Sequence, residues 1–226
     1  MGIFRLGPPE DTVLFLQQTK NIENFVETGT YYGCTAFWAS NHFTRVYTIE
    51  LSKKLFNQVK SNNSDFNNIE FILGDSRNEL KMVCKKLNGS AIFWLDAHFT
   101  TPDTSGVGED APIIDEIRII NKHSGAKDAF ILIDDARLFL SPPPRPHPIE
   151  SFVDYSLILS ELKNSFDREV IVFEDVIIAV PGEIREKFRM HIQNAVTIAW
   201  ENHSQEINRS DLQKSYFYFL KWIKNK

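Results

Sequence analysis

The stretch VETGTYYGCTAF, residues 26–37, has the outline of a nucleotide-binding turn between a strand and a helix. An apolar run ends in the acidic Glu27, and Gly29 and Gly33 open a segment with helical spacing. Dinucleotide-binding turns carry a further glycine between these two, which lets the backbone approach a pyrophosphate. Here that place is taken by Thr-Tyr-Tyr at residues 30–32. The stretch therefore predicts a strand, a turn and a helix, and leaves the ligand to be identified from the rest of the chain.

Short apolar runs recur along the chain and alternate with segments of helical spacing. We predict strands at 24–27, 46–50, 69–73, 91–95 and 130–133, and helices at 33–41, 53–61, 78–87 and 112–122. Strands that alternate with helices form a mostly parallel sheet covered on both faces. Right-handed crossovers then favour the α/β doubly wound, Rossmann-like fold.

The C-terminal third has a different pattern. Two strand-like runs, 169–173 and 176–180, are separated only by Glu174 and Asp175, which predicts a tight antiparallel hairpin at the edge of the sheet. Residues 182–226 have helical character and end in the aromatic segment KSYFYFLKWIKNK. That segment suits a membrane-surface or partner helix, but its spacing favours packing onto the domain or a second copy. We expect a single domain over 1–226, with a core at about 20–180 and a helical extension from 182.

Every predicted parallel strand ends in, or is followed by, an acidic residue. These residues are Glu27, Glu50, Asp75, Asp96 and the pair Asp134–Asp135. One acidic residue after a strand is common, because Asp caps helices and favours turns. Five strands that agree indicate a row of carboxylates at the edge where doubly wound sheets bind ligands.

Glu50 and Glu27 indicate the class of cofactor. Glu50 follows Gly29 by 21 residues, at the end of the second strand, where an acidic side chain binds a ribose. This position suits NAD as well as other adenosine cofactors. Glu27, however, lies where a pyrophosphate would approach, and a carboxylate there favours a cationic ligand. S-adenosylmethionine (SAM) carries a sulfonium and an ammonium group and no phosphate, so the first loop is better suited to SAM.

Over residues 20–180 the chain resembles the class I SAM-dependent methyltransferases. The motifs are VETGTYYG, TIEL, GDS, FWLDAH, ILIDDARLF and the hairpin VIVFEDVIIAVP. The resemblance implies that the first loop holds the methionine part of SAM, that the acid after strand two binds the ribose, and that the residues after strand three approach the adenine. The cofactor residues it implies are Glu27, Thr28, Gly29, Thr30, Glu50, Asp75, Ser76 and Asp96.

WLDAH and IDDAR resemble a narrower group, the metal-dependent macrocin-type sugar O-methyltransferases. That resemblance implies a Mg²⁺ site formed by Asp96, Asp134 and Asp135, and a sugar or glycosylated small molecule as acceptor. Three carboxylates in one site repel one another, and oxygen ligands favour Mg²⁺, Ca²⁺ or Mn²⁺ over zinc. The chain departs from the group in having Asp-Ala-His where a second acid is often found.

Two residues are candidates for catalysis. A sugar hydroxyl is weakly acidic, so its methylation needs a base, a metal ion or both. His98, two residues after Asp96, is the candidate base, and a histidine that only shapes its loop is the alternative. Asp96 is the second candidate.

The surroundings of these residues leave alternatives open. Arg137 either contacts an acidic acceptor or pairs with a nearby aspartate. Tyr31 and Tyr32 either line the cofactor or pack against the sheet, and packing is favoured. The polar segment 100–111 and the proline-rich segment 141–148 follow strands four and five, where loops set acceptor specificity.

Composition limits the remaining function classes. The chain has 226 residues, enough for one full-sized core, and a net charge of −5, which argues against a nucleic-acid partner. Cys34 and Cys84 are too few for a disulfide framework, and no apolar run is long enough to span a membrane. We expect a cytoplasmic enzyme. Whether it forms a homo-oligomer is left open. An NAD-dependent oxidoreductase, a non-catalytic SAM-binding module and a different reaction on the same scaffold are the rival functions.

Overall fold

The computed structural model describes residues 7–61, 66–97, 112–143, 145, 152–207, 215–216, 220 and 222, without the side chains of 205–207. The chain divides into two compact units, Met1–Arg185 and Glu186–Lys226. The sheet and the candidate site belong to the first unit, and most of helix α8 (Arg185–Ile207) belongs to the second. The prediction of one domain over 1–226 stays a prediction.

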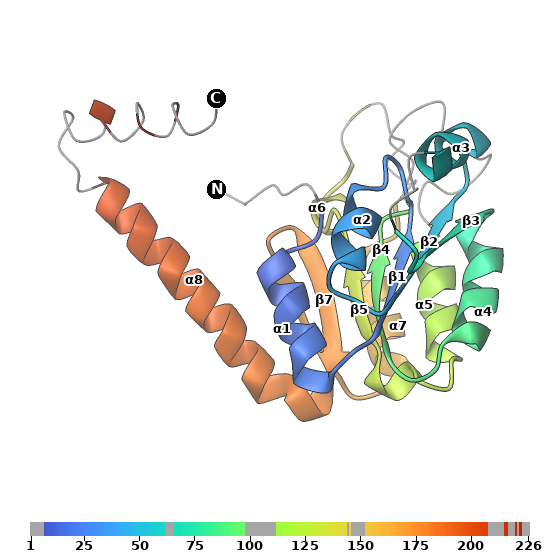
Figure 1. The fold of residues 1–226 in the computed structure, drawn as a ribbon. Coiled ribbons are helices and arrows are strands. Elements are labelled where there is room, and N and C mark those ends of the chain that lie inside the picture. The colour runs from blue at the N-terminus through green and yellow to red at the C-terminus, as the bar shows by residue number, and fades with distance from the viewer. Residues whose placement is uncertain are drawn as a thin grey trace. The chain divides into compact units, whose positions relative to one another are not determined.

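A seven-stranded sheet forms the centre of the first unit (Figure 1). Its strands are β1 (Asn24–Thr28), β2 (Arg45–Glu50), β3 (Ile69–Leu73), β4 (Ala91–Leu95), β5 (Phe130–Ile133), β6 (Arg168–Phe173) and β7 (Val176–Pro181). The strand order is β3-β2-β1-β4-β5-β7-β6. The first five strands pair in parallel, and β7 runs antiparallel to both of its neighbours. The predicted α/β doubly wound sheet is confirmed.

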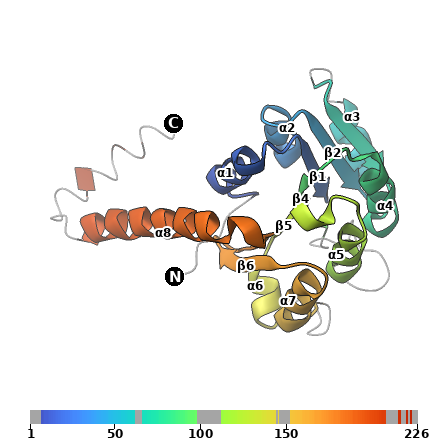
Figure 2. The ribbon, with the colours of Figure 1, turned by 90° about the horizontal axis from the view of Figure 1, so that it is seen from below.

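Helices cover both faces of this sheet. They are α1 (Glu10–Lys20), α2 (Cys34–Ser40), α3 (Lys53–Ser61), α4 (Ser76–Lys86), α5 (Ile113–Asn121), α6 (Arg137–Leu140) and α7 (Tyr155–Asn164). In Figure 2, α1 and α2 lie on one side of the strands and α5 and α7 on the other. Helix α4 contacts α5, and α5 contacts α7, so these three form one layer. The five predicted strands and the four predicted helices are all present, with ends shifted by at most two residues.

The main core lies between the sheet and the layer of α4, α5 and α7. Fully buried Leu80, Ile117 and Leu162 from these helices pack there with Val26 and Phe93 from the sheet. Because side chains alternate along a strand, Glu27 points to the opposite face from Val26. Burial of both faces explains why the central strands are almost continuously apolar.

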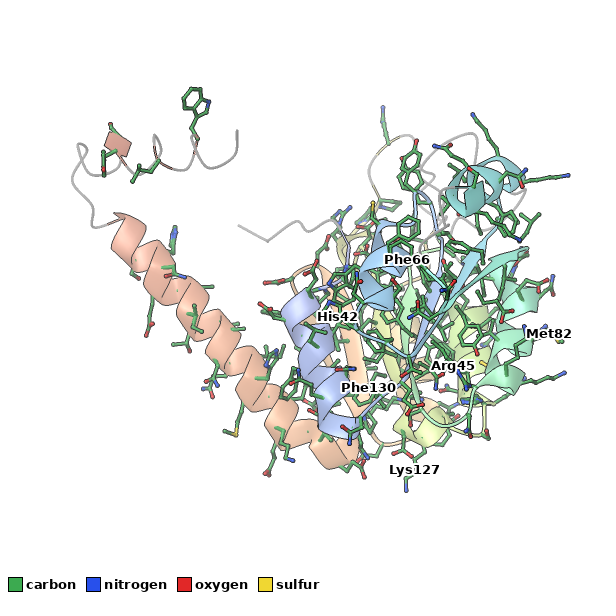
Figure 3. The ribbon with its side chains drawn as sticks, in the orientation of Figure 1. His42, Arg45, Phe66, Met82, Lys127 and Phe130 are labelled. Carbon is green, nitrogen blue, oxygen red and sulfur yellow. The ribbon has the colours of Figure 1, made fainter. Side chains whose placement is uncertain are left out.

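Aromatic side chains close the far side of the sheet. The rings of Phe37 and Phe66 stack with their centroids 5.0 Å apart (Figure 3). His42 follows α2 and lies 5.1 Å from the ring of Trp38. By contrast, Met82 projects outward from α4 and is half-exposed (Figure 3). His42 is exposed, and its ring lies against Trp38 at the surface.

The hairpin at the C-terminal edge is confirmed, and its turn has an unusual backbone. Glu174 and Asp175, the two residues between β6 and β7, both have positive φ, at 48° and 67°. Such a turn matches the right-handed twist of the flanking strands, but it normally uses glycine or asparagine. Strand β7 inserts between β5 and β6, which leaves β6 at the edge.

Three of the described helices, α1, α6 and α7, were not predicted from the sequence. Helices α1 and α7 contain the apolar runs VLFL and LIL, and runs as short as these suit a strand as well as a helix. In α7 the carboxylate of Asp154 accepts a 2.7 Å hydrogen bond from the backbone of Ser156 and fixes the helix start. In α1 the helix ends at Asn21, whose backbone is left-handed.

The predicted helical character of 182–226 is confirmed over α8. In the part of the chain that the structure describes, no helix combines the length and apolar character needed to cross a membrane. The packing prediction for the aromatic tail rests partly on residues outside that part, including Phe219 and Ile223.

Candidate functional site

The carboxyl ends of β1 to β5 meet at one edge of the sheet, which carries the predicted acidic residues (Figure 1). Backbone hydrogen bonds continue one residue beyond the strands. Gly29 N donates to Ile49 O at 2.9 Å, Asp96 N donates to Thr28 O at 3.0 Å, and Asp134 N donates to Leu95 O at 3.1 Å. These bonds hold the first residues of neighbouring loops in fixed relation, so the edge is a rigid platform for the side chains above it.

Gly29 is the point of closest approach in this edge. Its φ is +88°, and a Cβ built on it would lie 2.4 Å from the carbonyl oxygen of Asp96. That contact is with backbone, so nothing nearby can rotate away. The loop after β1 therefore presses directly against the end of β4, and only glycine fits there.

Glu27 is buried among hydroxyl groups. Its side chain belongs to a residue with 1% exposure, and Thr48 Oγ1 on β2 donates to its carboxylate at 2.6 Å. Thr48 Oγ1 also lies 2.6 Å from Thr30 Oγ1, and the hydroxyl of Thr35 on α2 forms a second hydrogen bond to Glu27. The loop, the strand and the helix thus meet around one carboxyl group.

Burial raises the pKa of Glu27 to about 8. The negative charges of Asp96 and Glu50 contribute to the increase, while the hydrogen bonds from Thr48 and Thr35 oppose it. Most of the Glu27 side chains are therefore protonated at neutral pH. The three carboxyl groups at the ends of β1, β2 and β4 are close enough to interact electrically, as their predicted gathering requires.

Glu50 is held by backbone N–H groups. One carboxylate oxygen accepts from Tyr31 N at 2.9 Å and the other accepts from Ser52 N at 2.7 Å. The residue is buried, at 6% exposure. Each oxygen keeps a further lone pair, so the side chain remains able to accept hydrogen bonds from a diol. This geometry is compatible with the predicted ribose contact.

Tyr31 and Tyr32 are half-exposed, at 53% and 50%, with ring centroids 4.2 Å apart. The favoured prediction that they pack against the sheet is wrong. Tyr31 has a φ of 49°, because its backbone N–H is directed to Glu50, and this turn carries both side chains outward. The alternative, that they line the cofactor, stays open.

Asp75 serves as the N-cap of α4. Its carboxylate accepts from Arg77 N at 2.9 Å and from the Arg77 guanidinium at 2.6 to 3.1 Å. The guanidinium holds the pKa of Asp75 below its usual range. Ser76 is buried and begins the helix. This cap explains why α4 begins two residues before its predicted start, and the adenine contact of both residues stays a prediction.

The loop after β5 is dominated by ion pairs. Asp134 is buried, and its carboxylate accepts from Asp135 N at 2.7 Å. Arg137 Nη1 lies 2.6 Å from Asp135 Oδ1 and also pairs with Asp175 in the β6–β7 turn. Of the two roles considered for Arg137, pairing with nearby aspartates is the observed one.

Asp175 ties the hairpin turn to this loop. Its carboxylate accepts from Arg137 N at 3.0 Å, and its carbonyl oxygen accepts from Ala136 N at 2.7 Å. Asp135 itself has a φ of 55°. The conformation of the Asp-Asp pair therefore depends on a residue about 40 positions later in the chain.

The arrangement does not match the metal site that the sequence implies. Within the described ranges, no three His, Cys, Asp or Glu side chains lie where they could hold one metal ion. Asp96, Asp134 and Asp135 are near the ends of neighbouring strands, but Asp135 pairs with Arg137. A cation bound by all three carboxylates would have to displace that guanidinium, so we derive no step through a metal.

Other predicted residues lie outside the described part of the chain. His98, the segment 100–111 and, of the predicted segment 141–148, residues 144 and 146–148 belong there. Asp96 is described, half-buried, and follows β4 directly. The charge of Asp96 helps to raise the pKa of Glu27, so the two carboxyl groups lie near each other. The catalytic and cofactor roles of Asp96 stay predictions.

Three side chains of the site, those of Thr35, Thr48 and Asp175, were not identified from the sequence. Thr48 had a signal, since it is a polar residue two positions before Glu50 and so lies on the same face of β2. For Asp175 the sequence gives no such signal. Its position in the turn was predicted, but its pairing with Arg137 depends on the strand order, which places β7 beside β5.

Comparisons with known proteins give likeness in structure alone. No family model and no curated protein matches the sequence. A candidate caffeoyl-CoA O-methyltransferase from Staphylococcus aureus is 16% identical, with a TM-score of 0.57, over 80% of this chain and 86% of that one. A candidate O-methyltransferase from Klebsiella pneumoniae is 11% identical, with a TM-score of 0.54, over 78% and 81%.

A third structure was solved with a ligand. The O-methyltransferase TomG from Streptomyces achromogenes, involved in tomaymycin synthesis and solved in complex with SAM, is 14% identical. Its TM-score is 0.50, over 79% of this chain and 82% of that one. Identities of this order are evidence for a common fold. The chain therefore has the Rossmann-like methyltransferase fold.

Proposed function

We propose that this chain transfers the methyl group of SAM to a hydroxyl group of a small-molecule acceptor. The observation that supports it most is the acidic surrounding of the first loop. Glu27 lies at the end of β1, and the charged groups that act on it are the carboxylates of Glu50 and Asp96. Such a site disfavours a pyrophosphate and favours the sulfonium and ammonium groups of SAM.

The cofactor contacts follow the strand ends. The loop from Glu27 to Thr30 takes the methionine part, Glu50 the ribose, and Asp75 with Ser76 the adenine. Glu50 supports this assignment because two backbone N–H groups already orient its carboxylate. Thr28 and Thr30 contribute through the backbone of the loop, since the Thr30 hydroxyl is engaged by Thr48.

The reaction is an in-line displacement at the methyl carbon. The acceptor oxygen forms a bond to this carbon while the carbon–sulfur bond breaks. The electron pair of the broken bond goes to the sulfur. The acceptor proton passes to a base, and His98 is the proposed base with Asp96 beside it. Alignment of the two reacting atoms supplies much of the rate in such transfers.

Two finer parts of the proposal concern acceptor and metal. The acceptor is proposed to be a sugar or glycosylated small molecule, on the resemblance of WLDAH and IDDAR alone. Mg²⁺ at Asp96, Asp134 and Asp135 belongs to the proposal only if Asp135 exchanges Arg137 for the cation. If the enzyme keeps full turnover after treatment with EDTA, the metal is excluded from the proposal and the methyl transfer remains.

The proposed function is tested by calorimetric titration with S-adenosylhomocysteine, with NAD as the control ligand. We expect binding of S-adenosylhomocysteine at micromolar concentration and none of NAD. Binding of NAD alone would transfer the protein to the oxidoreductases. Binding of neither ligand would favour a non-catalytic module.

A further inference from the structure

The carboxylates of the candidate site differ in the kind of partner that they have. Glu50 accepts from two backbone N–H groups, and Asp75 accepts from a backbone N–H and a guanidinium. N–H groups of this kind donate and cannot accept in return. They therefore offer no acceptor for the proton of a carboxylic acid.

Glu27 has hydroxyl partners instead. Thr48 and Thr35 form its hydrogen bonds, and Thr30 contacts Thr48 in turn, with both oxygen–oxygen distances along Glu27–Thr48–Thr30 at 2.6 Å. A hydroxyl group can donate to a carboxylate or accept from a carboxylic acid. By rotation of these hydroxyls the network remains satisfied in either protonation state of Glu27.

Among the residues that the structure describes, the charged groups that act on Glu27 are the acidic Asp96 and Glu50. Asp96 faces it from the end of β4 and Glu50 from the end of β2, while β2 and α2 contribute the uncharged Thr48 and Thr35. Burial beside two negative charges favours the neutral acid. A positive charge brought to the same place reverses that balance, since it favours the carboxylate.

We propose that a cationic cofactor displaces the proton of Glu27 when it binds, and that Thr48 and Thr30 are positioning residues that keep this carboxyl hydrogen-bonded in both states. The inference rests on the proposed function, because SAM supplies the positive charge. The O–H bond of the acid breaks, the electron pair stays on the carboxylate, and the proton passes to the buffer. No group is oxidised or reduced.

The test is calorimetric titration of the full chain with SAM at pH 7 in phosphate and in Tris, whose ionisation enthalpies differ. The difference between the two heats gives the number of protons released. With the pKa of Glu27 at about 8, about nine-tenths of this carboxyl is protonated at pH 7, so release approaches about 0.9 proton. S-adenosylhomocysteine, with one positive charge fewer, should release less.

Three variants isolate the source of the proton. Glu27→Gln keeps the shape of the protonated acid and should lose the release, while Glu70→Gln, exposed on β3 beside Lys86, should retain it. The α-amino group of SAM also titrates near pH 8, and the Glu27→Gln value subtracts its share. Thr48→Val should reduce the release and Thr48→Ser should restore it, which loss of packing alone would not do.

The outcomes separate the inference from the proposed function. Release that depends on Glu27 supports both. Binding of SAM with equal proton counts in wild type and Glu27→Gln overturns the inference and leaves the function. Absence of binding by SAM and by S-adenosylhomocysteine overturns both. If Glu27→Gln does not fold, the wild type still decides. Because binding releases a proton, the affinity for SAM should increase by up to about tenfold for each unit that the pH is raised, until the pH reaches about 8.

Discussion

The ends of β1 and β5 lie on the same edge of one sheet and treat their acidic residues in opposite ways. At β1, Glu27 is enclosed by hydroxyl groups and by other carboxylates. At β5, Asp135 pairs with Arg137, which also pairs with Asp175. Arg137 thus compensates the charge at the β5 end, whereas at the β1 end burial beside other acidic groups keeps most of Glu27 protonated at neutral pH. The comparison supports the proposal that the ligand binds at the β1 end, while ion pairs hold the β5 end within the protein.

The largest effect is expected from Gly29→Ala, which tests the β1 end. The new Cβ would lie 2.4 Å from the backbone oxygen of Asp96, at a φ of +88°. Either β1 or β4 must shift, so S-adenosylhomocysteine affinity should fall by more than about a hundredfold. Gly89→Ala is the matched control, since its φ is +93° with open space around it. It should cost about 1 kcal/mol of stability and leave binding unchanged. Equal binding by both variants would contradict the close approach.

The next effect concerns His98, which comes three residues after the last residue of β4 in the sequence. If His98 is the base, His98→Ala should reduce turnover by about a hundredfold or more, while S-adenosylhomocysteine affinity changes little. His203→Ala, at an exposed position of α8, serves as the control. A loss below about tenfold would remove His98 from the role of base.

The pH dependence of stability compares Glu27 with Asp75. Because the pKa of Glu27 is raised in the folded state, the stability it contributes is present below its unfolded pKa and is lost as pH rises towards 8. The slope should be about 1.4 kcal/mol per pH unit at most, and Glu27→Gln should remove it in urea unfolding between pH 5 and 8. Asp75, whose pKa is lowered, contributes above its unfolded pKa and loses that contribution as the solution becomes acidic. Identical slopes in wild type and Glu27→Gln would show that Glu27 does not titrate in this range.

Removal of the brace at β5 should have a smaller effect. Asp175→Ala removes one ion-pair partner of Arg137 and the carboxylate that accepts from its backbone N–H, and we expect a loss of about 1–3 kcal/mol in the free energy of unfolding. Asp167→Ala, at an exposed ion pair with Arg185, should change it by less than about 0.5 kcal/mol. A similar effect of both changes would mean that the turn does not support the loop.

The smallest effect is expected for metal binding at β5. Arg137→Gln leaves Asp135 without its guanidinium, so the affinity for Mn²⁺ should rise severalfold over that of the wild type. Titration followed by the signal of free Mn²⁺ measures it. Unchanged affinity would indicate that Arg137 does not compete with a cation at this position.

The fold was largely predictable because the signals that define it are local. Apolar runs bounded by turn residues gave all five parallel strands, and the two-residue spacing between Phe173 and Val176 gave the hairpin. Helices α1 and α7 were missed because their apolar runs, VLFL and LIL, are compatible with both kinds of element. The strand-end carboxylates were located from the same patterns.

The partners of those carboxylates were less predictable. Whether an acid is neutralised depends on what the topology brings to it across the sheet. Asp175 reaches Arg137 only because β7 inserts beside β5, and Tyr31 turns outward because its backbone binds Glu50. Neither arrangement follows from residue types at short spacing.

The insertion of β7 between β5 and β6 also has a consequence for the order of assembly. A chain that has emerged only as far as β5 can form the β1 loop and its hydroxyl network, since β1, β2 and β4 are already present. The same chain leaves β5 as an open edge, and such edges pair readily with other chains. Aggregation during synthesis should therefore be most frequent before residue 176 is available. A chaperone that protects this protein would act in that interval.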